Sequence, residues 1–337
     1  MSNELKAIES RREILFLYDI RMGNPNGDPD ENRPRRLPDG RFYVTDVRLK
    51  RFVRDYLAST GNKILVTDVD DQSVTLTGRV KEHLKEHKKE NLSGRELVDI
   101  ILDSFIDARL FGSALAFKKE DEWEEEASEG NEGKKKSKKK GKGGNWSPIP
   151  KALTGPVQFN MGEVLHDAEE IRIRGTSVFS SAEEKTQGTF TDYAALRYAL
   201  IAFNGIVNEH SATKTRMTSK DYDLLLRAVW NGVRSAGNTR TKVGQVPRLL
   251  ISVEYKEKEE FQFGNLMDYV KVCPRGEKPE REWASPTDYL LDLYILCSRL
   301  KDQQARIEVI RYEKSPDIEF TDPRLAERWE PLKFDVS

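Results

Sequence analysis

The chain has little of the residue types that build disulfide frameworks or metal centres: two cysteines and four histidines among 337 residues. Cys273 and Cys297 lie too far apart in sequence for a CxxC motif, and a disulfide-stabilised fold would need more cysteines. No run of about 18 apolar residues is present, and no apolar signal core follows the N-terminus. We therefore expect a cytoplasmic protein without a membrane segment, and we assign it no metal site and no cofactor.

The chain also lacks a surplus of charge of either sign. Its 56 lysines and arginines are matched by 57 aspartates and glutamates, and the formal net charge is −1. A nucleic-acid site would therefore have to be a local basic patch, offset by acidic residues elsewhere. The apolar fraction of 37% is enough for the core of one large domain or two ordinary ones.

Residues 19–36 combine a stretch rich in glycine, asparagine and proline with several arginines, directly after the apolar run 14–18. Such a composition cannot continue a strand or begin a helix, so we expect a loop at a sheet edge. Gly23 and Gly27 allow the backbone to approach a phosphodiester closely. The side chains that would meet an anion here are Asn24, Asn26, Arg33, Arg35 and Arg36.

Residues 46–58 are predicted to form an amphipathic helix with Thr45 as its N-cap. The flanks of its apolar stripe are basic, with Lys50, Arg51 and Arg54 on one side and Arg48 on the other. A solvated basic face is the ordinary explanation for such a helix by itself. Beside the arginine-bearing loop, however, six or seven cations can converge, which favours salt-sensitive, sequence-independent binding of nucleic-acid phosphates.

The order of predicted elements indicates an α+β fold. Strands are expected at 13–22, where alternation puts one face on the core, and then at 156–165, 197–207 and 248–255. A second helix follows Thr218 and Asp221, which have the spacing of a capping box. Strand, helix, strand, strand, helix, strand is the ferredoxin-like or RNA-recognition βαββαβ pattern.

Further segments interrupt or extend this core. Residues 60–117 carry a helix begun by Ser93 and Glu96, and residues 167–195 are too long for a tight hairpin and should project. Residues 118–145 are acidic and then lysine-rich, a composition that forms no packed core. A C-terminal helix is expected from Ser285 to about Gln303, burying Tyr289, Leu290, Leu293, Leu296 and Leu300.

Three motifs have alternative explanations. His83-Leu-Lys-Glu-His87 matches the inverted zinc-protease pattern, but its surroundings are nearly all charged, which favours a solvated helix. The loop with Asn238, Arg240 and Lys242 either adds cations to the patch or simply ends a helix. Phe179 and Phe190 either pack within a hairpin or insert between stacked bases.

The runs 24–30 and 44–51 resemble the backbone subunit of type I CRISPR Cascade complexes (RAMP superfamily), most closely the type I-B (Csh) branch. Further stretches agree with this resemblance: 108–113, 153–159, 186–190 and 244–250. The similarity spans roughly 13–117 and 150–270, whereas 118–145 departs from the usual pattern of the family.

The resemblance implies a hand-shaped protein. Its palm would comprise 13–59, 146–166 and 196–256, with a helical finger at 60–117, a thumb hairpin at 167–195 and a C-terminal extension at 257–337. The palm clamp for phosphates would fall on Thr45, Lys50, Arg51 and Arg54 with the 24–36 loop. Arg109 and Gln158 would line the groove, and Phe179 would displace a base of the guide.

The resemblance also implies partners. Copies of the protein would polymerise head to tail along a guide crRNA and present its spacer to the target DNA strand. The other Cascade subunits would be a processing endonuclease, a large subunit and a subunit that binds the repeat handle. Two alternatives stay open: an RNA endonuclease of the type III backbone kind, using Asp28, Asp30 or Asp46, and a monomeric RNA-binding module. We expect no catalytic residue, because arginines crowd the loop and no histidine lies in it.

Overall fold

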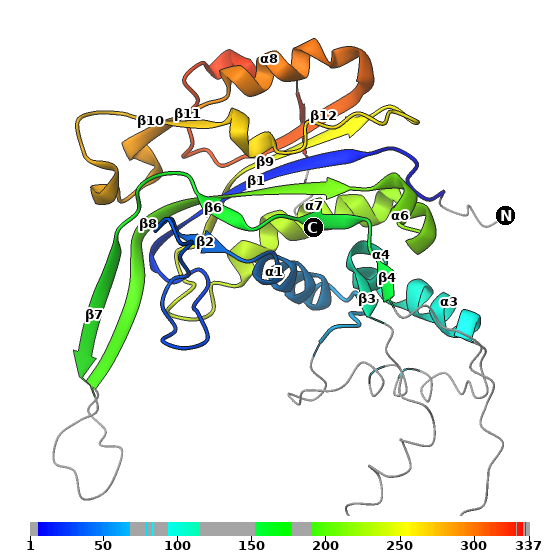
Figure 1. Ribbon diagram of the computed structural model, residues 1–337, viewed down its shortest axis with the longest axis horizontal. Helices are drawn as coiled ribbons and strands as arrows, with labels where there is room; N and C mark the ends of the chain where they lie inside the picture. Colours follow the sequence, from blue (N-terminus) through cyan, green and yellow to red (C-terminus); the bar gives the residue numbers. More distant parts are fainter. Residues whose placement is uncertain are drawn as a thin grey trace, which may run out of the picture. The chain divides into compact units, whose positions relative to one another are not determined.

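The computed structural model describes residues 6–67, 79, 83, 94–114, 152–176, 190–327, 329–332 and 334 (Figure 1). The chain divides into two compact units. The smaller comprises residues 1–8, 57–156 and 210–221, and the larger comprises 9–56, 157–209 and 222–337. None of the helices in the described ranges is both long and apolar enough to cross a membrane. The charged tract 118–145, Ser93, Phe179 and the second half of the H-x-x-E-H motif lie outside the described residues.

The larger unit is built on a sheet in which nine strands are described. Its order is β13-β12-β9-β1-β8-β6-β2, with β5 and β7 also paired to β8. All pairs are antiparallel except β12 with β13. The strands are β1 (Arg12–Gly23), β2 (Tyr43–Val44), β5 (Val157–Phe159), β6 (Gly162–Val164), β7 (Glu170–Thr176), β8 (Phe190–Val207), β9 (Val246–Tyr255), β12 (Ile307–Lys314) and β13 (Glu330–Pro331).

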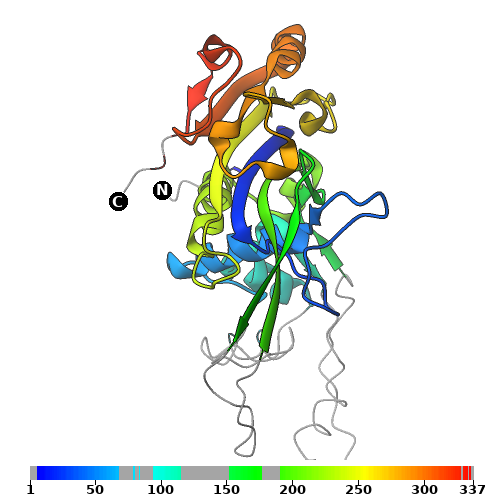
Figure 2. The same cartoon turned by 90° about the vertical axis from the view of Figure 1, so that its left-hand side faces the viewer.

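Two layers cover this sheet. Helices α1 (Asp46–Ser59) and α7 (Ser219–Ser235) lie along one face, and α8 (Tyr294–Asp302) lies on the other with β10 (Lys271–Pro274) and β11 (Tyr289–Asp292) (Figures 1 and 2). The two helices on the first face touch closely, because a Cβ added to Gly232 would lie 2.5 Å from the Phe52 carbonyl oxygen. The predicted order of strands and helices along the chain is observed in β1, α1, β6, β8, α7 and β9.

Strand β1 is buried on both faces, so the expectation that only one face meets the core was wrong. Leu15 and Leu17 join a cluster that includes Leu249, Ile251 and Trp283, while Tyr18 stacks on Phe203 with ring centroids 6.3 Å apart. Three charged residues of the strand, Arg12, Glu13 and Asp19, are themselves buried, whereas Arg21 is exposed. The C-terminal region covers the second face, where Leu15 and Leu17 lie, and the continuous apolar run 14–18 is typical of a strand buried on both faces.

Buried charges fasten the C-terminal region to the sheet. The Glu13 carboxylate accepts hydrogen bonds from the Tyr255 hydroxyl and from the amides of Phe263 (2.9 Å) and Gly264 (2.8 Å). On the same strand, the carboxylate of Asp19 accepts from Arg248 Nε at 2.7 Å. Paired in this way, these carboxylates make the strand compatible with burial on both sides.

The C-terminal helix is shorter than predicted. Pro286–Asp288 form a single 3-10 turn, in which Ser285 and Asp288 make a capping box, and β11 then pairs with β10. Helix α8 begins only at Tyr294, and Leu290 is partly exposed. Tyr289, Leu293, Leu296 and Leu300 are buried as expected. Strand pairing with a distant segment overrode the helical spacing of these residues.

The 167–195 excursion begins as a two-stranded ribbon. Strand β7 pairs with the first half of β8, from Glu170 opposite Leu196 to Thr176 opposite Phe190. The ribbon extends away from the rest of the sheet in both views (Figures 1 and 2). The single strand predicted at 156–165 is instead two short ones, β5 and β6, where Asn160 and Asn204 exchange hydrogen bonds between the strands.

The smaller unit contains helices α3 (Gly94–Ser104), α4 (Ile106–Phe111) and α6 (Glu209–Thr215), and the strand pair β3 (Gly112–Ala114) with β4 (Ala152–Thr154). Its core includes Leu97, Ile101 and Phe105, which follow one another at the spacing of one helix turn. His83 is buried against Phe105 and bonds to Ser104 at 2.9 Å, so the solvated helix expected at this position is incorrect for His83. The Thr218–Asp221 capping box is confirmed, with Thr218 N donating to Asp221 at 2.9 Å.

Candidate nucleic-acid interface

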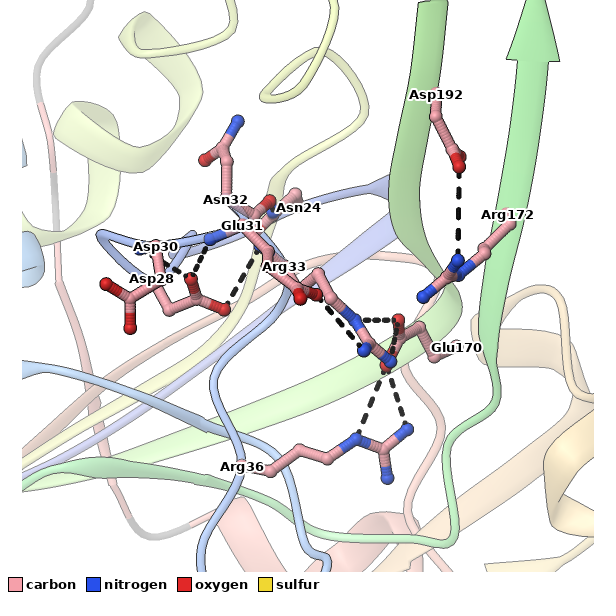
Figure 3. A network of polar contacts seen from close by, with 10 residues as sticks. All are labelled: Asn24, Asp28, Asp30, Glu31, Asn32, Arg33, Arg36, Glu170, Arg172 and Asp192. Carbon is pink, nitrogen blue, oxygen red and sulfur yellow. Dashed lines mark hydrogen bonds and ion pairs between the residues drawn. The ribbon is translucent and has the colours of Figure 1, made fainter.

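The loop from Asn24 to Arg36 is held by its own polar groups (Figure 3). Asn24 is 1% exposed; its side chain donates to the Asn32 carbonyl oxygen at 2.7 Å and accepts from Asn26 N at 3.1 Å. The Asp28 carboxylate accepts from the amides of Asp30 (3.0 Å), Glu31 (2.8 Å) and Arg33 (3.2 Å). These backbone donors hold the pKa of Asp28 below its usual value.

A second set of hydrogen bonds joins this loop to the start of α1. The Asn26 side-chain oxygen accepts from both Thr45 N (2.9 Å) and Thr45 Oγ1 (2.8 Å). Thr45 Oγ1 in turn accepts from Arg48 N at 3.3 Å, which confirms Thr45 as the N-cap of the helix. Asn26 and Thr45 therefore position the loop and the basic helix relative to each other.

Two of the loop arginines are bound by a carboxylate from the ribbon. Arg33 Nε lies 2.8 Å from Glu170 Oε1, and the Arg36 guanidinium lies 3.0 Å from Glu170 Oε2 (Figure 3). The Glu170 side chain is 6% exposed, whereas those of Arg33 and Arg36 are 37% and 44% exposed. Both guanidinium groups were expected to face phosphate; the structure pairs them internally, so much of their charge is compensated. Arg35 donates to the Gly27 carbonyl oxygen at 3.3 Å.

The basic flank of α1 is partly paired within the helix. Lys50 Nζ donates to Asp46 at 3.0 Å and to Gln158 Oε1 on β5 at 3.2 Å, so Gln158 lies beside the helix. That Gln158 lines a groove for RNA stays a prediction. Arg51 bonds to Asp55 at 2.7 Å while half-exposed, and Arg54 is partly buried. Exposed ion pairs of this kind are weak, so an arriving phosphate can replace the carboxylate as partner.

The loop after α7 approaches the Asn24 loop directly. Asn24 N donates to the Thr241 carbonyl oxygen at 3.0 Å, and Lys242 Nζ donates to the Asn24 carbonyl oxygen. Gly23 permits this contact, because a Cβ there would lie 2.8 Å from the Thr241 oxygen. Arg240 lies over the ring of Tyr193, 4.8 Å from its centroid, and Asn238 is exposed. The two loops and the start of α1 thus meet at one edge of the sheet.

Arg109, which the resemblance placed in the groove, makes hydrogen bonds within the smaller unit. Its guanidinium bonds to Asp221 at 3.1 and 2.7 Å and to the Leu102 carbonyl oxygen at 2.7 Å, all within the smaller unit. The Asp221 side chain is 6% exposed. These contacts give the Arg109 side chain a structural role, because they join α4 to Asp221 and to the end of α3. We do not place Arg109 among the phosphate contacts.

Sequence reasoning missed three residues of this region: Tyr18, Tyr193 and Glu170. The Tyr18 hydroxyl is buried without a hydrogen-bond partner among the described residues, and the Tyr193 ring lies under the Arg240 guanidinium. Glu170 was counted only as part of the projecting segment. Its spacing of two from Arg172 and of four from Arg174 puts the three side chains on the same face of β7, and this was the one available signal that Glu170 lies among arginines.

A cleft of about 830 Å³ is lined in part by Glu170, and its charged lining is mixed, with Arg36, Arg41 and Arg281 among a larger number of carboxylates. Carboxylates from Glu163, Asp167, Glu169 and Asp268 contribute to it. Within the described ranges, no group of three or more His, Cys, Asp or Glu residues is arranged to hold a metal ion. Carboxylates outnumber arginines in this lining, so the cationic edge is the better candidate for nucleic acid.

The fold and this edge define a mixed α+β protein with cations clustered where two loops and a helix start meet. The sequence model of the family described as CRISPR-associated protein Cas7 matches residues 10–294. A CRISPR-associated protein Cas7 from Haloferax volcanii is 33% identical over 310 residues, covering 89% of this chain and 86% of the relative. The chain therefore belongs to the Cas7 family, as the resemblance predicted.

Two solved structures share the fold. One is described as a CRISPR RNA-guided surveillance complex and the other as such a complex before nicking. Each contains a chain that matches with a TM-score of 0.51 and 14% identity, covering 97% of this chain and 95% or 96% of the other. At this identity the likeness concerns the arrangement of helices and strands.

Proposed function

We propose that this protein is a backbone subunit of a CRISPR RNA-guided surveillance complex and binds the phosphates of the guide RNA without reading its sequence. The observation that carries the proposal is the cationic edge in a member of the Cas7 family. Arg48, Lys50, Arg51 and Arg54 line the helix, and Arg240 and Lys242 line the facing loop. Contacts of this kind bind the backbone and leave the bases available for pairing.

The order of strands in the sheet supports a hand-shaped architecture with a palm, a thumb and a finger. The order β9-β1-β8-β6, with α1 and α7 on one face, agrees with an RNA-recognition-like palm. The ribbon of β7 and β8 is the base of the proposed thumb, and Phe179, which lies outside the described residues, is the candidate for displacing a base. Residues 60–117 would be the finger.

Sequence-independent binding of RNA phosphates also allows several copies of the protein to assemble on one RNA. A contact between copies that does not close on itself makes a helical filament, and the length of the RNA then sets the number of protomers. We propose that copies align head to tail along the crRNA and present it to a target DNA strand. An endonuclease that makes the guide, a large subunit and a repeat-handle subunit would complete the complex.

The first test is the mass of the particle formed with a guide-length RNA. Several protomers per RNA, increasing with RNA length, are expected. One protomer per RNA at every length would favour the monomeric binding module. In the same tubes, periodic cleavage of labelled RNA in Mg²⁺ or Mn²⁺ would overturn the scaffold role.

The second test removes cations from the edge. Lys50→Ala with Arg54→Ala should weaken binding similarly for unrelated RNA sequences and should flatten the salt dependence. Arg299→Ala with Lys301→Ala makes the same charge change on α8, on the other face of the sheet, and should change neither quantity much. A loss confined to particular sequences would contradict backbone recognition.

A further inference from the structure

Arg248 lies at an irregularity of β9, where one extra residue interrupts the pairing with β1. Leu17 pairs with Leu249, but the next residue, Tyr18, pairs with Pro247, so Arg248 is the extra residue of a β-bulge. A bulge bends its strand and changes the direction of a side chain. Arg248 is 7% exposed in spite of its charge. The partners of this buried guanidinium therefore show what the bulge achieves.

The bulge brings Arg248 to the face of the sheet that carries Asp19. Asp19 lies two residues after Leu17 and shares its face, whereas strict alternation would put Arg248 on the face opposite to Leu249. Arg248 Nε nevertheless donates to the Asp19 carboxylate at 2.7 Å. The same carboxylate accepts from the Tyr198 hydroxyl at 2.7 Å. Asp19, Tyr198 and Arg248, here called the Asp19 cluster, thus join β1, β8 and β9.

The C-terminal segment completes this cluster. Arg248 Nη1 donates to Asp317 at 2.7 Å and to Ser315 Oγ at 3.1 Å, and the Arg248 carbonyl oxygen accepts from Ser315 N at 2.9 Å. The Asp317 side chain is 59% exposed, whereas that of Asp19 is 2% exposed. Asp19 is therefore the buried acceptor through which the strands are joined.

The Asp19 cluster lies where three neighbouring strands leave the sheet. Strands β9, β1 and β8 lie side by side (Figure 1). Strand β1 ends four residues after Asp19, and β9 begins two residues before Arg248. The pairing of β8 with β1 ends two residues before Tyr198. Beyond these points run the 24–36 loop, the loop that carries Lys242 and the ribbon, which contact one another at the cationic edge.

A buried ion pair at this place needs a reason other than stability. The loss of hydration offsets most of the attraction between two buried charges, and apolar side chains often replace such a pair without loss. Leu15 and Leu17 already fill the neighbouring positions on this face of β1. Hydrogen bonds are directional, so they can fix one strand end relative to the next, which apolar packing does less strictly.

We propose that Asp19 and Arg248 are positioning residues for the cationic edge. They hold the ends of β1, β8 and β9 so that the cations beyond them match a run of phosphates, and they touch no RNA themselves. The proposal rests on the proposed function, because it assumes that RNA binds at this edge. A preorganised edge binds more tightly, since its side chains lose less freedom when RNA arrives.

Asp19→Asn is the first test, because its two possible effects on RNA binding have opposite signs. The substitution removes a negative charge near the edge, which by electrostatics alone would strengthen binding. Loss of positioning should instead weaken binding by about 3- to 10-fold, as expected when one long cationic side chain must be ordered by the ligand. The measurement is fluorescence anisotropy of a labelled single-stranded RNA at constant ionic strength, at a temperature where circular dichroism shows each variant to be folded.

Glu13→Gln is the matched control. It makes the same charge change on the same strand, about 20 Å farther from the edge, and it also weakens a buried acceptor of several hydrogen bonds. The melting temperature should fall in both variants. The affinity for RNA should fall only in Asp19→Asn.

Tyr198→Phe and Tyr255→Phe repeat this comparison without a change of charge. Each removes one hydroxyl that donates to a buried carboxylate, Asp19 in the first variant and Glu13 in the second. Only Tyr198→Phe should weaken RNA binding, and this pair decides if Asp19→Asn does not fold. Hydrogen exchange adds a second measurement: the Asn24 amide, which bonds to the facing loop, should exchange faster in the two edge variants and unchanged in the two controls.

RNA binding by Asp19→Asn or Tyr198→Phe that equals or exceeds that of wild type overturns the inference and leaves the proposed function standing. Equal losses of affinity in the edge variants and in their controls also overturn it, because general destabilisation would then explain both. Absence of RNA binding by wild type overturns the proposed function, and the inference with it.

Discussion

Arg33 and Glu170 are 137 positions apart in sequence, yet Arg33 Nε lies 2.8 Å from the Glu170 carboxylate. The same carboxylate binds Arg36, so one glutamate at the first position of β7 holds two arginines of the 24–36 loop (Figure 3). This contact joins the loop to the base of the projecting ribbon. It also decides how much positive charge the loop offers to a phosphate.

Glu170→Gln should therefore have two effects. The melting temperature should fall by about 2–4 °C, since a nearly buried acceptor for two guanidinium groups is weakened. The released arginines should make RNA binding more salt-dependent, by about 1–1.5 in the slope of log affinity against log salt. Thermal unfolding and salt titrations of RNA binding measure the two effects.

Glu169→Gln is the matched control for this substitution. Glu169 pairs with Arg197, and both side chains are about 40% exposed. Exposed pairs contribute little, so the melting temperature should hardly change. An unchanged salt slope in Glu170→Gln would show that Arg33 and Arg36 stay away from RNA even when unpaired.

Arg109→Met should destabilise the protein without lowering its affinity for RNA. The substitution leaves the nearly buried Asp221 carboxylate without its guanidinium, at a cost of about 2–4 kcal/mol in the free energy of unfolding. Urea denaturation checks this. Arg216→Met, whose partners Asp99 and Asp103 are exposed, should cost under about 1 kcal/mol. Normal stability with weaker RNA binding would instead indicate that Arg109 contacts nucleic acid.

Asp28→Ala should loosen the loop rather than abolish a reaction. Its carboxylate accepts three backbone amides, so exchange of the Asp30, Glu31 and Arg33 amides should become faster. Because the pKa of Asp28 is lowered, its contribution is present above the ordinary carboxylate pKa and is lost as pH falls further. Hydrogen exchange measures this, with the exposed Asp30→Ala as control. Loss of an RNA-cleaving activity on substitution would revive the endonuclease alternative.

His166 should make the fold sensitive to mild acid. Its ring packs between Tyr198 and Trp283, Nε2 accepts from Leu200 N at 3.3 Å, and burial lowers its pKa to about 4. The unfolded chain takes up a proton near pH 6.5 and the folded chain does not, so stability should fall between pH 6.5 and 4. The loss should be about 1–3 kcal/mol, and smaller in His166→Gln. Equal slopes in wild type and variant would contradict this.

Local signals were read correctly from the sequence. Thr45 caps α1 and Thr218 forms a capping box with Asp221, because each involves groups only a few residues apart. The C-terminal helix was predicted too long, because the contact that ends it involves a segment farther away in the sequence. The spacing of Tyr289, Leu293, Leu296 and Leu300 suits a helix, but Tyr289–Asp292 pair with β10, a partner that local periodicity does not reveal.

By itself, the sequence determined the family, the order of strands and helices, and the two loops and helix that carry the cations. Only the tertiary structure decided which cations are compensated: Glu170 pairs with both Arg33 and Arg36, whereas Lys242 is buried and donates to the Asn24 carbonyl oxygen. The physical reason is that charge, burial and pKa depend on distances between side chains. Those distances are set by strand pairing and by packing between segments far apart in the chain.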